Sequence, residues 1–198
     1  MKQIALFLIL IALVPRASAQ DKEKEATLFS GRITFGGYGG PQLKLADFGD
    51  KTAVLVGGKG GLILNRALVI GGGGYGLAND IEVTDLVTRR LEFGYGGLYI
   101  EYIAMTTKLV HFTVETLIGG GGVDIADTLD RFGRLHNGES DSFFALEPGA
   151  HAELNIAEFM RLAVGATYLF VDGTELSFLD DDDFSGVNAS FVLKFGNF

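Results

Sequence analysis

The sequence contains no cysteine among its 198 residues, so neither a disulfide framework nor a cysteine-linked lipid anchor can form. Basic residues are few: 16 Lys and Arg stand against 25 Asp and Glu, a net charge of −9. A surface of this sign repels phosphates, so we expect no nucleic-acid partner. Long apolar runs are missing too. After residue 20 no run approaches the about 20 apolar residues that a transmembrane helix needs.

The first residues have the layout of a secretory signal peptide. Lys2 supplies the positive charge, residues 4–14 form a short apolar run, and Ala17-Ser18-Ala19 offers small residues before a cleavage site. We expect cleavage between Ala19 and Gln20. The predicted organisation is therefore a signal peptide over 1–19 and one domain over 20–198.

Glycine and strict alternation characterise the rest of the chain. There are 29 glycines. Apolar and polar residues also alternate, with Val110, Phe112 and Val114 on one face and His111 and Glu115 on the other. A period of two indicates β-strands. We expect eight, most of them long enough to cross a bilayer when tilted, near residues 28–41, 52–64, 67–78, 90–104, 108–124, 142–155, 160–171 and 185–196.

The connections between these strands alternate in length. Those near 65, 106 and 157 are tight, those over 79–89, 125–141 and 172–184 are long and acidic, and the one near 42–51 is intermediate. Outer-membrane barrels have short periplasmic turns and long outer loops. The sequence therefore predicts an all-β fold, an eight-stranded antiparallel transmembrane β-barrel. We expect a monomer in the cell outer membrane, in contact with its lipid and lipopolysaccharide.

A period of two by itself fits a soluble barrel equally well. In a soluble barrel the apolar face of each strand points inward, and in a membrane barrel it points outward. Aromatic residues near strand ends favour the membrane barrel, since they would form an interfacial girdle. These residues are Phe35, Tyr99, Tyr102, Tyr168, Phe191 and Phe195.

Several segments also resemble a known family. FGGYGGPQLKL (35–45), VLVGGKGGLILNRALVIGGGGYGLAND (54–80), LEFGYGGLYIEYI (91–103) and LVHFTVETLIGGGG (109–122) are similar to small glycine-rich outer-membrane barrels of Bacteroidota-like bacteria. The resemblance covers most of the chain and implies the same fold and location. It implies no activity, so it transfers no site residues.

With the apolar faces toward lipid, a set of ionisable residues points inward. An eight-stranded barrel is only wide enough for side chains to fill it, and buried charges must be paired. We expect a structural salt-bridge network; a proton path, an acid–base pair or a His–carboxylate metal site are alternatives. The set comprises Arg32, Lys59, Glu101, His111, Glu115, Glu147, His151, Glu153, Arg161 and Lys194.

Glycine clusters occur in each of the first five predicted strands. They permit tight coiling beneath aromatics such as Tyr38, Tyr75 and Tyr95, or they leave a pocket in the outer half for a small apolar ligand. The possible lining residues are Gly37, Gly58, Gly73, Gly96 and Gly121.

The acidic loops, including Asp180 to Asp183, and the loop residue His136 match no metal or catalytic motif. We expect no cofactor and no enzymatic activity, but a structural or surface-binding role. A narrow channel or carrier for small apolar compounds and a lipid-modifying enzyme are the alternatives.

Overall fold

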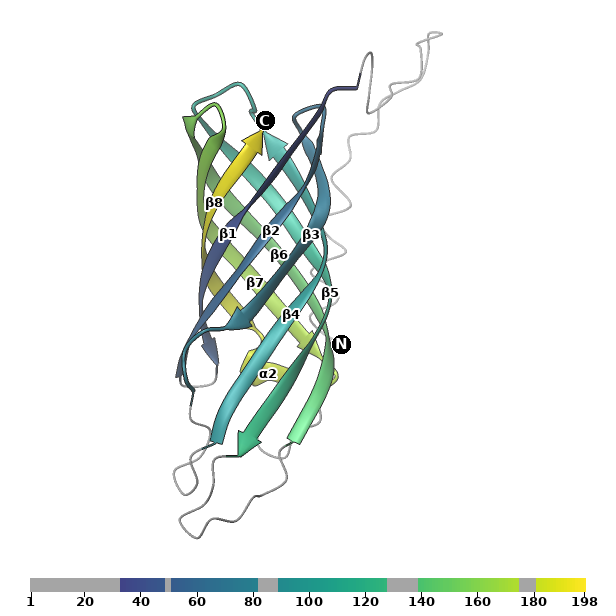
Figure 1. The fold of residues 1–198 in the computed structure, drawn as a ribbon, viewed down its shortest axis with the longest axis vertical. Helices are drawn as coiled ribbons and strands as arrows, with labels where there is room; N and C mark the ends of the chain where they lie inside the picture. Colours follow the sequence, from purple (N-terminus) through teal and green to yellow (C-terminus); the bar gives the residue numbers. More distant parts are fainter. Residues whose placement is uncertain (1–32, 49–50, 82–88, 128–138, 175–180) are drawn as a thin grey trace, which may run out of the picture. The chain divides into compact units, whose positions relative to one another are not determined.

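The computed structural model describes residues 33–48, 51–81, 89–127, 139–174 and 181–198. Each strand pairs antiparallel with its sequence neighbour, and β1 also pairs with β8, so the sheet closes into the predicted barrel (Figure 1). The elements are β1 (Phe35–Phe48), β2 (Lys51–Leu64), β3 (Leu68–Leu77), β4 (Arg89–Ala104), β5 (Val110–Asp127), β6 (Glu139–Ala157), β7 (Met160–Asp172), α2 (Asp181–Phe184) and β8 (Gly186–Asn197).

The first strand lies further along the chain than predicted. Residues 28–32 lie outside the described part, and β1 continues past Pro41 to Phe48, pairing Gln42 with Gly57 and Phe48 with Lys51. The intermediate connection predicted over 42–51 is therefore wrong, because the alternation of Gln42 and Lys44 with Leu43 and Leu45 extends the strand. Only residues 49–50 separate β1 from β2.

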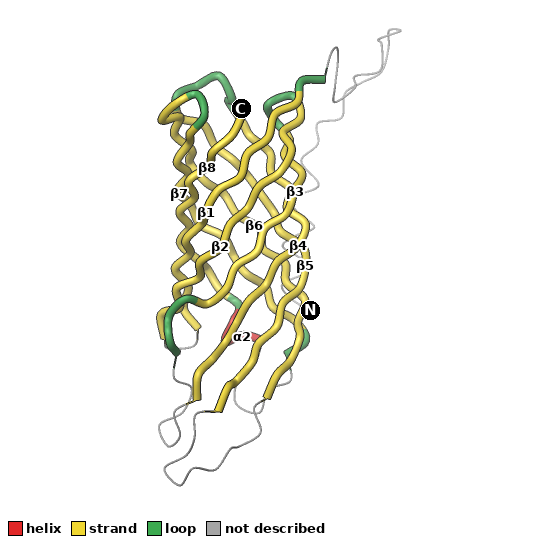
Figure 2. Tube along the Cα trace, in the orientation of Figure 1, coloured by secondary structure: helices red, strands yellow, loops and turns green. Residues whose placement is uncertain are grey.

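The turns and loops gather at opposite ends of the barrel. The tight connections β2–β3, β4–β5 and β6–β7 lie at the same end as the start of β1 and the end of β8, whereas α2 lies at the other end (Figure 2). We call these the short-turn end and the long-loop end. Among the described residues no helix is long and apolar enough to span a bilayer.

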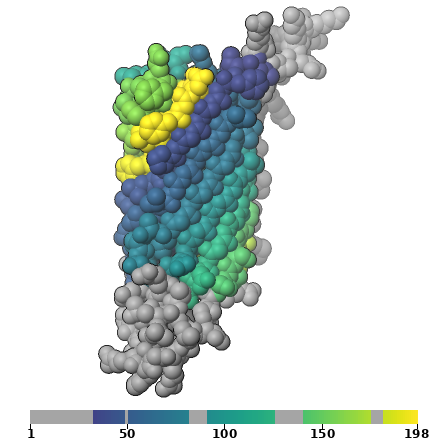
Figure 3. All heavy atoms as spheres, viewed as in Figure 1, coloured from purple at the N-terminus to yellow at the C-terminus, as the bar shows by residue number. Residues whose placement is uncertain are grey.

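The outer surface of the barrel wall is apolar along most of its height. Neighbouring strands run diagonally side by side with their side chains closing the wall (Figure 3). On β5, Val110, Phe112 and Val114 are about half exposed, while His111 and Thr113 between them are buried. Other exposed residues of this apolar belt include Leu43, Leu45, Val56, Leu62, Ile70, Leu98, Leu154, Val164, Phe170 and Val187.

Five of the six aromatic residues predicted for the girdle point outward. Phe35, Tyr102, Tyr168, Phe191 and Phe195 are exposed on the outer surface. Tyr99 is buried instead, because the register of β4 places it on the same face as Glu101. Its hydroxyl lies among the interior carboxylates rather than at a lipid interface.

The distribution of polar residues reverses at the long-loop end. There the outward residues Asp47, Glu92 and Asp124 are exposed and polar, while the inward positions are apolar. This end contains a cluster of aromatic side chains: Phe93 stacks on Phe143 and on Phe184 of α2, with ring centroids 5.0 and 5.2 Å apart. The barrel therefore has an apolar core at its long-loop end. The charged interior lies between this core and the short-turn end.

Candidate functional site

The structure places nine of the ten predicted interior residues inside the barrel. All nine are buried, while Arg32 lies outside the described residues. They come from six of the eight strands, because the period of two turns one face of each strand inward. The nine are Lys59, Glu101, His111, Glu115, Glu147, His151, Glu153, Arg161 and Lys194.

Among the described residues, sequence reasoning missed one charged member of this network, Lys44, and the uncharged tyrosine, threonine and serine residues that bond to it. The Nζ of Lys44 lies 2.7 and 2.6 Å from the two carboxylate oxygens of Glu147, and only 1% of Lys44 is exposed. The hydroxyls of Tyr95 and Thr167 donate to the same carboxylate at 3.0 and 2.6 Å. The alternation Gln42-Leu43-Lys44-Leu45 was the signal that could have found it, once β1 was extended.

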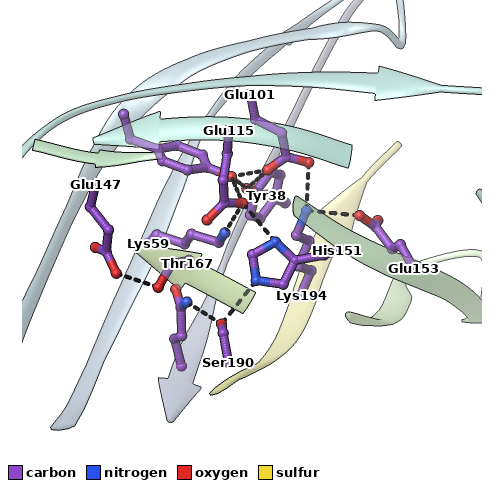
Figure 4. Close-up of polar contacts among 12 residues, drawn as sticks. Tyr38, Lys59, Glu101, Glu115, Glu147, His151, Glu153, Thr167, Ser190 and Lys194 are labelled. Atoms are coloured by element: carbon purple, nitrogen blue, oxygen red, sulfur yellow. Dashed lines mark hydrogen bonds and ion pairs between the residues drawn. The ribbon is translucent and has the colours of Figure 1, made fainter. Parts of the chain in front are cut away.

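The centre of the network joins β2, β4 and β5. Lys59 Nζ donates to Glu115 Oε2 at 2.5 Å, and the hydroxyl of Tyr99 donates to the same oxygen at 3.0 Å (Figure 4). Glu101 and Glu115 are direct cross-strand partners on β4 and β5. Two like charges in this position repel each other, so each carboxylate needs its own lysine.

Glu101 obtains its lysine from β8. Lys194 Nζ lies 2.6 Å from Glu101 Oε1 and 2.8 Å from Glu153 Oε2, and so bridges two carboxylates (Figure 4). The hydroxyl of Tyr38 also donates to Glu101 Oε2 at 2.6 Å, and the hydroxyl oxygen of Tyr99 lies between the Glu101 and Glu115 carboxylates, with one hydrogen for the two. Nearer the short-turn end, Arg161 Nη1 lies 3.3 Å both from Glu153 Oε1 and from His111 Nε2.

Each interior cation also lies over an aromatic ring. Lys44 lies 3.3 Å from the centroid of Tyr75, and Lys59 and Lys194 lie 4.6 Å from those of Tyr99 and Tyr38. Arg161 lies 3.8 Å from the ring of Phe198. A ring face attracts a desolvated cation, so each of these four cations has both a carboxylate and a π-face as partners.

Three residues of the network have the order of a catalytic triad. Ser190 Oγ lies 2.9 Å from His151 Nε2, and His151 Nδ1 lies 3.2 Å from Glu115 Oε2. The second contact is within ion-pair distance but is not aligned as a hydrogen bond. Ser190 is fully buried and also accepts a hydrogen bond from Gln42 at 2.7 Å. Ser190 has no exposed surface, so a substrate does not reach its hydroxyl in this arrangement.

The predicted pocket glycines divide between the two faces. Gly73 and Gly121 lie on the inner face, where a Cβ at Gly121 would stand 2.5 Å from the ring of Phe143. A Cβ at Gly73 would stand 3.2 Å from Lys59 Cβ and 3.3 Å from Leu117 Cδ1, so neighbouring side chains occupy the space that both glycines leave. Gly37, Gly58 and Gly96 alternate with inward-facing Tyr38, Lys59 and Tyr95, so they lie on the outer face instead.

The described residues contain no group of three or more His, Asp or Glu side chains that could hold a metal ion. His136 and Asp180 lie outside these residues. Within the same acidic loop, Asp181 accepts hydrogen bonds from the backbone N–H groups of Gly173 and Thr174 at 3.2 and 2.8 Å. Its role there is to hold α2 against the end of β7.

Comparison with solved structures identifies the same architecture in known proteins. The chain superposes on the N-terminal β-barrel domain of Pseudomonas aeruginosa OprF with a TM-score of 0.53 and 13% identity, over 82% of this chain and 96% of that one. It superposes on Neisserial surface protein A with a TM-score of 0.54 and 10% identity, over 84% and 97%. The fold is that of small outer-membrane barrels.

A third barrel, Ail of Yersinia pestis, solved with the heparin analogue sucrose octasulfate, gives a TM-score of 0.49 at 18% identity over 82% of this chain and 95% of that one. No model of a protein family matches the chain, and no curated protein sequence does. At these identities the likeness extends to the fold. Membership of the glycine-rich Bacteroidota-like family stays a prediction.

Proposed function

We propose that this chain is a monomeric outer-membrane protein with a structural or surface-binding role. One observation carries the proposal: in the belt of the barrel, charged residues face inward and apolar residues face outward. Lys44, Glu101 and Lys194 are buried while Leu43, Tyr102 and Phe195 are exposed. Exposed apolar surface of this extent is costly in water and favourable against acyl chains. The belt would contact outer-membrane lipid, and the acidic long-loop end would lie near lipopolysaccharide headgroups.

Cell fractionation tests the location. We expect a product that begins at Gln20, after removal of residues 1–19, and that sediments with outer membranes. On a gel it should migrate differently when it is not boiled, because a closed barrel with all its strands paired resists unfolding by detergent. A product in the soluble periplasmic fraction, with the same mobility boiled and unboiled, would contradict the proposal.

The second part of the proposal is that the interior is sealed. Its support is a charged network between two apolar clusters, one at the long-loop end around Phe93 and one at the short-turn end around Ile63 and Tyr99. Charged side chains that are paired with one another offer no continuous water path. Reconstituted in a planar bilayer, the protein should give no steady ion conductance, with a porin in the same bilayer as the positive control.

The two rival functions predict different results. Reproducible conductance steps would favour a channel or carrier. Lipid A that loses or gains acyl chains during incubation with the protein would favour a lipid-modifying enzyme, with Ser190 and His151 as the first positions to mutate. No conductance and unchanged lipid A would support the structural or surface role.

A further inference from the structure

A cavity of about 480 Å³ opens at the short-turn end of the barrel. Three turns meet around it: Arg66 comes from the β2–β3 turn, Thr106 from the β4–β5 turn, and Glu158 from the β6–β7 turn. Arg161 and Phe198 line it from β7 and from the end of the chain. A smaller cavity of about 180 Å³ shares Arg66 and Phe198 with it. Arg161 connects this mouth to the paired network deeper in the barrel, because it also contacts Glu153.

Arg161 brings a buried positive charge to this cavity. Only 8% of the residue is exposed, and its guanidinium carbon Cζ lies 3.8 Å from the ring centroid of Phe198. Among the described residues its contacts with Glu153 and His111 both use Nη1, at 3.3 Å each. A guanidinium has five N–H donors in a fixed fork. The donors on Nη2 and Nε therefore have no protein acceptor among those residues, on a side chain that lines the cavity.

Arg66 brings a second positive charge to the rim of the cavity. Its backbone has a left-handed conformation that is unfavourable for arginine. Asn65 and Arg66 have φ angles of 50° and 60°, and Ala67 N–H donates to the Leu64 carbonyl at 3.0 Å, which makes a two-residue turn with both central residues left-handed. Glycine is the usual second residue of such a turn. Any other residue except asparagine or aspartate is strained there, by about 1–2 kcal/mol. Strained residues persist at functional positions.

We propose that this mouth binds a small oxyanion, a carboxylate or a phosphate group, between Arg161 and Arg66. A planar fork recognises two oxygens of such a group at once. Thr106 and Asn197 line the same cavity and can donate further hydrogen bonds. Glu158, an acid on the rim, opposes binding and sets its strength. This proposal does not depend on the proposed function. If the protein spans the outer membrane as proposed, the mouth would face the periplasm.

Two sources could supply this chemistry: a free solute, or the phosphate of a lipid headgroup at the membrane rim. In a non-ionic detergent, titration with inorganic phosphate and with acetate should shift the side-chain Nε–Hε signal of Arg161 in a saturable way. In phospholipid nanodiscs, a signal already shifted before any anion is added identifies the headgroup. A signal that shifts only on addition of phosphate or acetate identifies a free solute.

Matched variants distinguish specific binding in the cavity from nonspecific attraction of an anion to positive charge at this end of the barrel. Arg66→Gln should weaken phosphate binding about tenfold, the scale of one lost hydrogen bond to a charged group, and Glu158→Gln should strengthen it. Lys108→Gln makes the same change in net charge on a neighbouring turn and should leave binding unchanged, because Lys108 is exposed and does not line the cavity. The proposal is overturned if no saturable shift occurs in detergent or nanodiscs, or if Lys108→Gln weakens binding as much as Arg66→Gln.

Discussion

A carboxylate buried in this barrel is stabilised by several partners at once, as Glu115 illustrates. Its Oε2 lies within 3.2 Å of a lysine, a tyrosine hydroxyl and a histidine nitrogen: Lys59, Tyr99 and His151. Removing a charge from water costs several kcal/mol, and only partners of this quality offset it. Deleting one member of such a pair leaves the other charge buried alone.

We therefore expect Glu115→Ala to lower the free energy of unfolding by about 3–5 kcal/mol, because Lys59 is then buried without its carboxylate. Urea unfolding of the barrel in lipid vesicles measures this change. Asp182→Ala is the control, since Asp182 is exposed at the long-loop end, and it should change stability by less than about 0.5 kcal/mol. Equal stability of the two variants would show that Glu115 is not part of a paired interior.

At the scale of elements, α2 closes the long-loop end from inside. Its last residue, Phe184, is 1% exposed and packs against Phe48 and Phe93, with centroids 5.4 and 5.2 Å away. A helix of four residues is too short to be stable alone. Its position therefore depends on this aromatic contact and on the hydrogen bonds that Asp181 accepts at its first turn.

These hydrogen bonds make the position of α2 depend on pH. The Thr174 hydroxyl, with the N–H groups of Thr174 and Gly173, holds the pKa of Asp181 below its usual range. A depressed pKa means that the contribution is complete above the unfolded-state value, about 3.9, and is lost as pH falls through the folded-state value. The backbone amide signal of Thr174 should therefore move only as the pH falls below about 4. Asp181→Asn should abolish this transition; if the variant retains it, another group is responsible.

The outer wall of the whole molecule has an apolar belt and, at the long-loop end, a polar part. A charge introduced into each part tests where the bilayer lies. Val114 lies in the apolar belt of β5, 61% exposed, whereas Asp124 lies on the same outward face where the wall has become polar. Val114→Arg should destabilise the barrel by about 2–4 kcal/mol, the cost of a charge near the midplane. Asp124→Arg should cost almost nothing. Folding into lipid vesicles, followed by gel mobility without boiling, compares them, and equal yields would contradict a membrane-spanning belt.

Much of the fold followed from the sequence because one physical rule governs every strand. Alternation with a period of two marked the eight strands, and the short and long connections gave their order. The prediction was wrong about the end of β1, where alternation continued beyond Pro41, and about Tyr99, where an aromatic residue was assigned to an interface by type rather than by register.

The candidate site was predicted as a set of residues but not as a set of contacts. Nothing in the local sequence indicates that Lys59 meets Glu115 rather than Glu147, or that Ser190 meets His151, because these pairs are 56 and 39 residues apart. The short-turn cavity also had no signal, since its lining comes from three turns and the end of the chain.

The sequence alone determined that nine of the predicted ionisable residues face inward, because each strand exposes alternate side chains to opposite sides and the apolar side favours lipid. It also determined that the interior charges must be paired, since a buried charge cannot remain without a partner. Only the tertiary structure decided the partners, the aromatic core at the long-loop end and the cavity between Arg66 and Arg161. Those features depend on the stagger between strands and on the space that side chains leave, which closure of the barrel fixes and local sequence does not encode.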